Sequence, residues 1–202
     1  WKIRITNTGN GVDSIILTLD NIPSDWNYTF TSPTLDLSTS PPDDMKFITL
    51  SLDIPTTAPP TTYDFNVTAQ SLGTSVNLTL NLTLNTIYQV YVKETSAIEL
   101  TGQSDETVYF QFDVTNKGNS ADTITVEGGG SMVDQAQPIG FSWTTKTLQP
   151  NETQSNWFKA TIPNGEGPWT ALVTVTSSDS STAAETLTFT LNGQILPDAS
   201  VR

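Results

Sequence analysis

The chain of 202 residues contains neither cysteine nor histidine. Without cysteine no disulfide can stabilise the fold, and without histidine the commonest general base and a principal zinc ligand are missing. Lysine and arginine are scarce, with 8 such residues against 21 aspartates and glutamates, so the formal net charge is −13. Nucleic acids and anionic membranes attract basic clusters, which makes both improbable partners. We expect no enzymatic activity and no cofactor, and paired carboxylates leave glycoside hydrolysis as the one mechanism readily open.

Long apolar runs are also absent. No stretch approaches the roughly 20 apolar residues that a membrane-spanning helix needs, and no basic and then apolar segment opens the chain. We therefore expect no membrane insertion by this segment, and we expect any anchor or export signal to lie outside it.

An internal repeat divides the sequence in two. Residues 5–15 align without gaps on residues 114–124, an offset of 109. Three further pairs of blocks follow in the same order with offsets of 108, 106 and 107, namely Ile54-Pro55 with Ile162-Pro163, Tyr63–Thr68 with Trp169–Thr174, and Leu80–Asn85 with Leu187–Asn192. The repeat predicts one domain over residues 1–87, a second over 88–197 and a tail over 198–202.

Most blocks alternate between apolar and polar residues, as a half-buried strand does. One face of the strand near residue 80 carries Val76, Leu78, Leu80, Leu82 and Leu84, which we expect to face the core. No window sustains a helical period, so the fold class is all-β, as two tandem Ig-like Greek-key β-sandwiches. The repeated Thr-Asn-x-Gly-Asn segment is interpreted as a hairpin turn in which Gly9 and Gly118 adopt positive φ.

The two units resemble the extracellular Ig-like repeats typified by the NEW3 (alpha-galactosidase-associated) and CARDB families of archaeal and bacterial surface proteins. The segments that carry the resemblance are Ile5–Asn10, Asn21–Trp26, Ile54-Pro55 and Tyr63–Thr68 in the first unit, and the shared turn, Trp143, Leu148–Thr153 and Ile162-Pro163 in the second. The resemblance implies a spacer, adhesion or accessory module with no shared catalytic residues. An insertion near residues 127–137 departs from it and is where unit-specific function is expected.

The second domain has an alternating segment, Tyr88–Lys93, that predicts an initial strand before the strand ending at Val114. The first domain has no equivalent, because its matching strand begins at Trp1, so we expect it to lack its first strand. Either an upstream segment supplies that strand, or another chain adds one at the Trp1–Ile5 edge and so drives self-assembly.

Candidate sites are few. N-glycosylation sequons occur at Asn27, Asn66, Asn77, Asn81 and Asn151, of which 66, 77 and 81 are expected to face solvent. Calcium, which prefers oxygen ligands, has weak candidates in Asp13, Asp122, Asp43, Asp44, Asp105 and Glu106, but the sequence favours solvated surface positions or capping of turns for these residues. We expect all five tryptophans to pack in the core or at its corners, with Trp1 and Trp157 in the core and Trp169 the best exposed candidate for stacking on sugars.

The sequence as a whole favours a non-catalytic structural or adhesive module of a larger cell-surface or secreted protein, as part of a stalk, surface layer or filament. Its expected partners are neighbouring domains of the same polypeptide, further copies joined by strand addition, or a glycan. One alternative is a carbohydrate-binding accessory module of a secreted glycoside hydrolase. Another is a calcium-stabilised adhesin.

Overall fold

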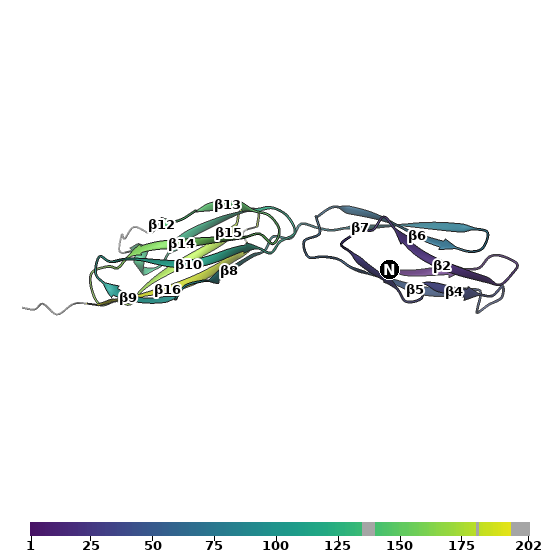
Figure 1. Cartoon of the computed structure of the whole chain (residues 1–202), viewed down its shortest axis with the longest axis horizontal. Helices are drawn as coiled ribbons and strands as arrows, with labels where there is room; N and C mark the ends of the chain where they lie inside the picture. The colour runs from purple at the N-terminus through teal and green to yellow at the C-terminus, as the bar shows by residue number, and fades with distance from the viewer. Residues whose placement is uncertain (135–139, 181, 195–202) are drawn as a thin grey trace, which may run out of the picture. The chain divides into compact units, whose positions relative to one another are not determined.

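The computed structural model describes residues 1–134, 140–180 and 182–194. The chain divides into two compact units, Trp1–Asn85 and Thr86–Arg202, and each is built almost entirely of strands (Figure 1). The one helix among these described residues, α1, spans Ser131–Asp134. Among the described residues no helix has the length and apolar character to cross a bilayer.

Unit 1 is a sandwich of two antiparallel sheets. A three-stranded sheet has the order β1-β5-β3 and a four-stranded sheet the order β4-β2-β6-β7. The strands are β1 (Lys2–Thr6), β2 (Asp13–Asp20), β3 (Asn27–Phe30), β4 (Thr34–Leu37), β5 (Met45–Asp53), β6 (Thr62–Gln70) and β7 (Ser75–Thr83).

Unit 2 repeats this plan with two more strands. Its sheets have the orders β12-β14-β10-β8 and β13-β11-β15-β16-β9, and the last pair, β16 and β9, is parallel. The strands are β8 (Val90–Glu94), β9 (Glu99–Gln103), β10 (Thr107–Asn116), β11 (Asp122–Gly129), β12 (Gly140–Phe141), β13 (Thr145–Leu148), β14 (Thr153–Thr161), β15 (Trp169–Ser177) and β16 (Ala184–Gln194).

The sheet orders are those of an immunoglobulin-like sandwich. In unit 2, β8-β10-β14 form the A, B and E strands of one sheet and β11-β15-β16 the C, F and G strands of the other. β9 continues the A strand on the opposite sheet. Unit 1 has the B to G strands, from β1 to β7, and within residues 1–85, all of which are described, nothing occupies the place of β8 or β9. The all-β prediction of two tandem Ig-like sandwiches is confirmed.

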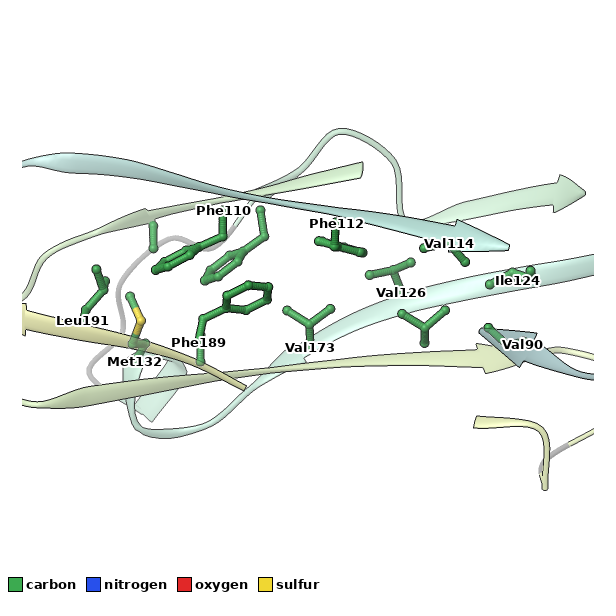
Figure 2. Packing of buried hydrophobic residues seen from close by; sticks show 14 of the residues in the cluster. Val90, Phe110, Phe112, Val114, Ile124, Val126, Met132, Val173, Phe189 and Leu191 are labelled. Atoms are coloured by element: carbon green, nitrogen blue, oxygen red, sulfur yellow. The ribbon is translucent and has the colours of Figure 1, made fainter. Parts of the chain in front are cut away.

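The core of unit 2 is closed and aromatic. Phe110, Phe158 and Phe189 are fully buried and come from three different strands, with ring centroids 4.6 to 5.5 Å apart. Figure 2 shows Phe110 and Phe189 in this core. Val90 of β8 seals one end of this core beside Val114 and Ile124. Each such side chain contributes about 1.5–3 kcal/mol when it is fully buried.

The core of unit 1 is open along β7, which corrects one prediction. Val76 and Leu78 are 65% and 44% exposed, although they lie on the same face of the sheet as the buried Val67 and Phe65. The remaining leucines of that row, Leu80, Leu82 and Leu84, are half-buried. The alternation was therefore right about the shared face, but the opposite sheet of unit 1 has too few strands to cover it.

The structure also corrects the alignment of the last repeated block. Val67 pairs with Leu78, and its equivalent Val173 pairs with Leu187, so the offset for this strand is 109 rather than 107. A strand that alternates strictly matches itself after a shift of two residues, because its side-chain period is two. Only the cross-strand register separates the two alignments.

The repeated turn is not a hairpin. β1 and β2 belong to opposite sheets, as do β10 and β11, so the turn crosses the sandwich. Neither Gly9 nor Gly118 is among the described glycines with positive φ. Gly118 is needed for another reason, because a Cβ there would overlap the backbone carbonyl oxygen of Ile87.

Candidate functional site

In each unit, the asparagine of the repeated turn forms hydrogen bonds that link the two sheets of the sandwich. Asn116 Nδ2 donates to the carbonyls of Ser120 and Leu148 at 2.8 and 2.9 Å, and its Oδ1 accepts from the Gly118 amide at 2.8 Å. Asn7 Nδ2 donates to the carbonyls of Gly11 and Ser38 at 2.8 and 3.1 Å, and at 3.4 Å to that of Leu37, the equivalent of Leu148, while its Oδ1 accepts from the Gly9 amide. Each side chain thus ties one sheet to the edge strand of the other, which is a structural use of the motif.

The calcium candidates are divided between the two units. Asp13, Asp43 and Asp44 belong to unit 1, and Asp105, Glu106 and Asp122 to unit 2. The described residues contain no group of three or more acidic side chains arranged to hold a metal ion. The Glu106 carboxylate accepts a hydrogen bond from the backbone N–H of Gln103 at 3.0 Å and so caps the turn between β9 and β10. The structure therefore gives the calcium interpretation no positive support.

Asp122 is the one acidic side chain described as buried. Its Oδ1 accepts from the Ser177 hydroxyl at 3.0 Å, whereas Oδ2 has no hydrogen-bond partner. Burial raises the pKa of the Asp122 carboxyl, and the nearby Asp179 charge acts in the same direction. This carboxylate is less favourable in the folded state when it is ionised, and its side-chain hydrogen bond, to Ser177, lies within unit 2.

Three of the five sequons gather on the outer face of one sheet in unit 1. Asn77 lies opposite Thr68 and Asn81 opposite Asp64, while Asn66 is on the same β6–β7 ladder and opposite Thr79. Asn77 and Asn81 are exposed and Asn66 is half-buried. Asn27 and Asn151 are exposed as well. Asn66 and Asn81 also bond to their neighbours, Thr79 and Asp64.

The tryptophans divide between core and surface. Trp26 is buried, and Trp143 and Trp169 are half-buried against the core of unit 2. Trp1 is 39% exposed and packs edge-on against Phe65, so it is a lid on the core and not part of it.

Trp157 was predicted to be in the core and is instead on the outer face, because Phe158 takes the inward position of β14. It forms a pair with the exposed Tyr109 at a centroid distance of 5.5 Å, with the ring planes at 78°. Sugar rings stack on flat aromatic faces, so two perpendicular rings do not make a platform of coplanar aromatics.

A groove lies on the surface of unit 1. Its volume is about 380 Å³, and it runs between the free edge of β1 and the start of β7. Ile5, Ile15, Ala69 and Val76 supply its apolar lining, and Arg4 stands at its edge.

Sequence reasoning identified only the β1 side of this groove. A signal for the β7 side was present, because unit 1 has Val76 where the register places Glu185 in unit 2. A single exposed apolar residue is common, but Val76 and Leu78 form a contiguous exposed apolar surface on one face of the sheet, which is typical of a surface that another segment covers. That signal depends on the 109 offset, which the alternating sequence concealed.

No family model matches the chain, and no curated protein is significantly similar to it in sequence. The resemblance to the NEW3 and CARDB families therefore has no support at the level of a family. Among solved structures, the ASH/PapD-like domain of human CEP192 is 17% identical with a TM-score of 0.36, over 54% of this chain and 85% of that one.

Two further solved structures show the same range of similarity. A family 123 glycoside hydrolase from Clostridium perfringens is 12% identical with a TM-score of 0.40, over 48% of this chain and 23% of the hydrolase. Domains 4 and 5 of the S-layer protein SbsC are 12% identical with a TM-score of 0.36, over 84% and 70% of the two chains. Similarity this low specifies no function, and the class of the protein, a pair of Ig-like β-sandwich units, follows from the strand orders.

Proposed function

We propose that this chain is a non-catalytic structural or adhesive module of a larger cell-surface or secreted protein. The proposal rests on one observation, which is that the polar side chains of the repeated turn and of the candidate sites form hydrogen bonds to the chain's own backbone. Asn7 and Asn116 hold backbone together across the sandwich, and Glu106 caps a turn. These groups bond to the protein itself, which suits a module whose task is to keep its shape.

The outer face of β6 and β7 supports a location outside the cell. On export, the sequons at Asn66, Asn77 and Asn81 would place up to three glycans on one sheet face, where no core packing is disturbed. A hydrated, acidic and glycosylated surface keeps a projecting module soluble. We propose that this face is glycosylated and turned to solvent in the native protein.

Immunogold electron microscopy with an antibody against this chain tests the location on cells that express the natural gene. We expect label at the cell surface or in shed material. Label confined to the cell interior would contradict the proposal. Glycopeptide mapping of the natively exported protein tests the glycosylation, and the expected result is occupancy at Asn77 or Asn81 ahead of the half-buried Asn66.

A further inference from the structure

The groove of unit 1 lies where unit 2 holds its first strand. In unit 2, β8 runs antiparallel to β10, with Val92 opposite Val114 and Val90 opposite Asn116. The equivalents of Val114 and Asn116 in unit 1 are Ile5 and Asn7, and both line the groove. β1 has a neighbour, β5, on one side only, so its other edge is free where β10 carries β8.

The groove is lined by apolar side chains, most of them at positions that are fully buried in unit 2. Ile5, Ile15 and Ala69 correspond to Val114, Ile124 and Val175, all of which are fully buried in the same cluster as Val90 in unit 2. Figure 2 shows Val114 and Ile124 beside Val90. In unit 1, Ile5 and Ala69 are only partly buried. A volume of about 380 Å³ equals that of about a dozen water molecules, which is room for more than one valine-sized side chain.

The backbone edge beside the groove is suited to a strand. In unit 2 the Lys117 amide donates to the Gln89 carbonyl at 2.7 Å, and the Thr95 amide donates to the Gln111 carbonyl at 2.9 Å. The equivalents of Lys117 and Gln111 are Thr8 and Lys2, at the two ends of the free edge of β1. An unpaired edge of this kind binds an extended peptide through its main chain.

The charge at the groove differs between the units in an informative way. Asp113 of β10 lies directly opposite Lys93 of β8. Its equivalent in unit 1 is Arg4, one of only 8 basic residues in the chain. Opposite charges stabilise facing residues on paired strands, and like charges destabilise them. The strand that pairs with β1 should therefore carry an acidic residue where β8 carries Lys93.

We propose that the groove between β1 and β7 is a strand-binding site for a peptide segment from outside residues 1–202. The segment lies antiparallel to β1, seats two apolar side chains at alternate positions over Ile5, Ile15 and Ala69, and directs a carboxylate at Arg4. A second copy of this chain is a poorer occupant, because withdrawing its own β8 would open the core that Val90 closes. The site belongs to unit 1 alone and does not require the surface role proposed above.

The test uses the full chain and two synthetic peptides. One peptide has the chain's own sequence from Tyr88 to Gln103, and the other differs only by Lys93→Glu. Because a facing charge pair contributes modestly, we expect the acidic peptide to bind about two- to fivefold more tightly at low salt. That preference should shrink as salt is raised. The variant Arg4→Glu should reverse the preference, and the matched control Lys159→Glu, an exposed charge change in unit 2, should leave it unchanged.

Hydrogen–deuterium exchange locates the bound peptide. We expect new protection in β1 and at the start of β7, and none in β10. Failure of both peptides to bind would overturn the proposal, as would binding without protection of β1. A preference that Arg4→Glu does not alter would overturn the proposed register. Self-association of the free chain with β1 protected would replace the external segment by a second copy.

Discussion

Asn7 and Asn116 each hold three backbone segments together with one side chain, but their surroundings differ. Asn116 is fully buried, whereas Asn7 is partly exposed and one of its bonds, to the Leu37 carbonyl, is 3.4 Å long. A buried backbone group that loses its partner costs about 1–3 kcal/mol, whereas a group near the surface can bond to water instead. The two positions therefore offer a direct comparison of the same motif.

We expect Asn116→Ala to lower the free energy of unfolding of unit 2 by about 2–3 kcal/mol. Asn7→Ala should lower that of unit 1 by about 1 kcal/mol, since water replaces part of what is lost. Differential scanning calorimetry of the full chain, with the two transitions assigned by these variants, measures both. Equal losses in the two units would contradict the role of burial.

Asp122 gives unit 2 a pH dependence of known sign. A pKa that is raised in the folded state means that folding favours the protonated carboxyl. The contribution of Asp122 to stability is therefore fully present below its unfolded-state pKa and is lost as the pH rises through the raised folded-state value. Asp122→Asn keeps the shape of the side chain and removes the charge.

We expect Asp122→Asn to stabilise unit 2 by about 1 kcal/mol at pH 7, since it removes a buried negative charge and keeps the oxygen that accepts from Ser177, while an amide nitrogen takes the place of the unpaired oxygen. The advantage should shrink as the pH falls towards 4. Calorimetric unfolding at both pH values measures the difference. Asp13→Asn at the half-buried equivalent position of unit 1 is the control and should change little, while a gain at Asp122 that persisted undiminished in acid would rule out this account.

At the level of elements, the repeated turn requires a glycine at position 118 in unit 2 but not at position 11 in unit 1. A Cβ on Gly118 would overlap the Ile87 carbonyl oxygen, which belongs to the backbone and cannot rotate away. A Cβ on Gly11, at the end of the corresponding turn in unit 1, would have nothing within 4 Å.

We expect Gly118→Ala to destabilise unit 2 by about 1–3 kcal/mol, because the incoming methyl group forces a backbone shift. Gly11→Ala should change the stability of unit 1 by less than about 0.5 kcal/mol. Urea denaturation followed by circular dichroism measures both variants. If the two substitutions cost the same, close approach to Ile87 is not the reason for Gly118.

The strands themselves were predictable because burial on one face imposes alternation on the sequence. Phe110, Phe112 and Val114 alternate in the sequence and all three are buried. Alternation does not show which of two apolar residues faces inward, and so Trp157 was placed on the wrong side of β14 while Asn156 and Phe158 took the inner positions. The inward-facing Asn156 donates to the Trp143 carbonyl and accepts from the Ser142 amide, contacts outside β14 that its alternation does not encode.

The open edge near Trp1 could be predicted from the duplicated sequence, whereas the groove could not. Its second wall depends on how β7 is aligned with β16, and an alternating strand fits equally well two residues away. Asp122 shows the same limit, since its burial arises from packing against Ser177, 55 residues further along the chain. The identity of both sites depends on contacts that local patterns do not encode.

At the scale of the chain, unit 2 is a closed sandwich and unit 1 is an open one. Unit 2 covers both faces of its core with nine strands among the described residues, whereas the seven of unit 1 leave Val76 and Leu78 in solvent. Edge strands with few buried neighbours open locally at low cost. We therefore expect equivalent strands of the two units to differ in stability even though their sequences match.

Hydrogen–deuterium exchange on the full chain makes this comparison strand by strand. We expect the amides of β1 and β7 to exchange at least tenfold faster than those of β10 and β16, because β8 and β9 cover only the second pair. The inner strands β2 and β11, which have neighbours on both sides in both units, serve as the matched control and should differ less. Equal protection of β1 and β10 in the isolated chain would mean that the edge of β1 is already covered, and the groove would then be no free surface.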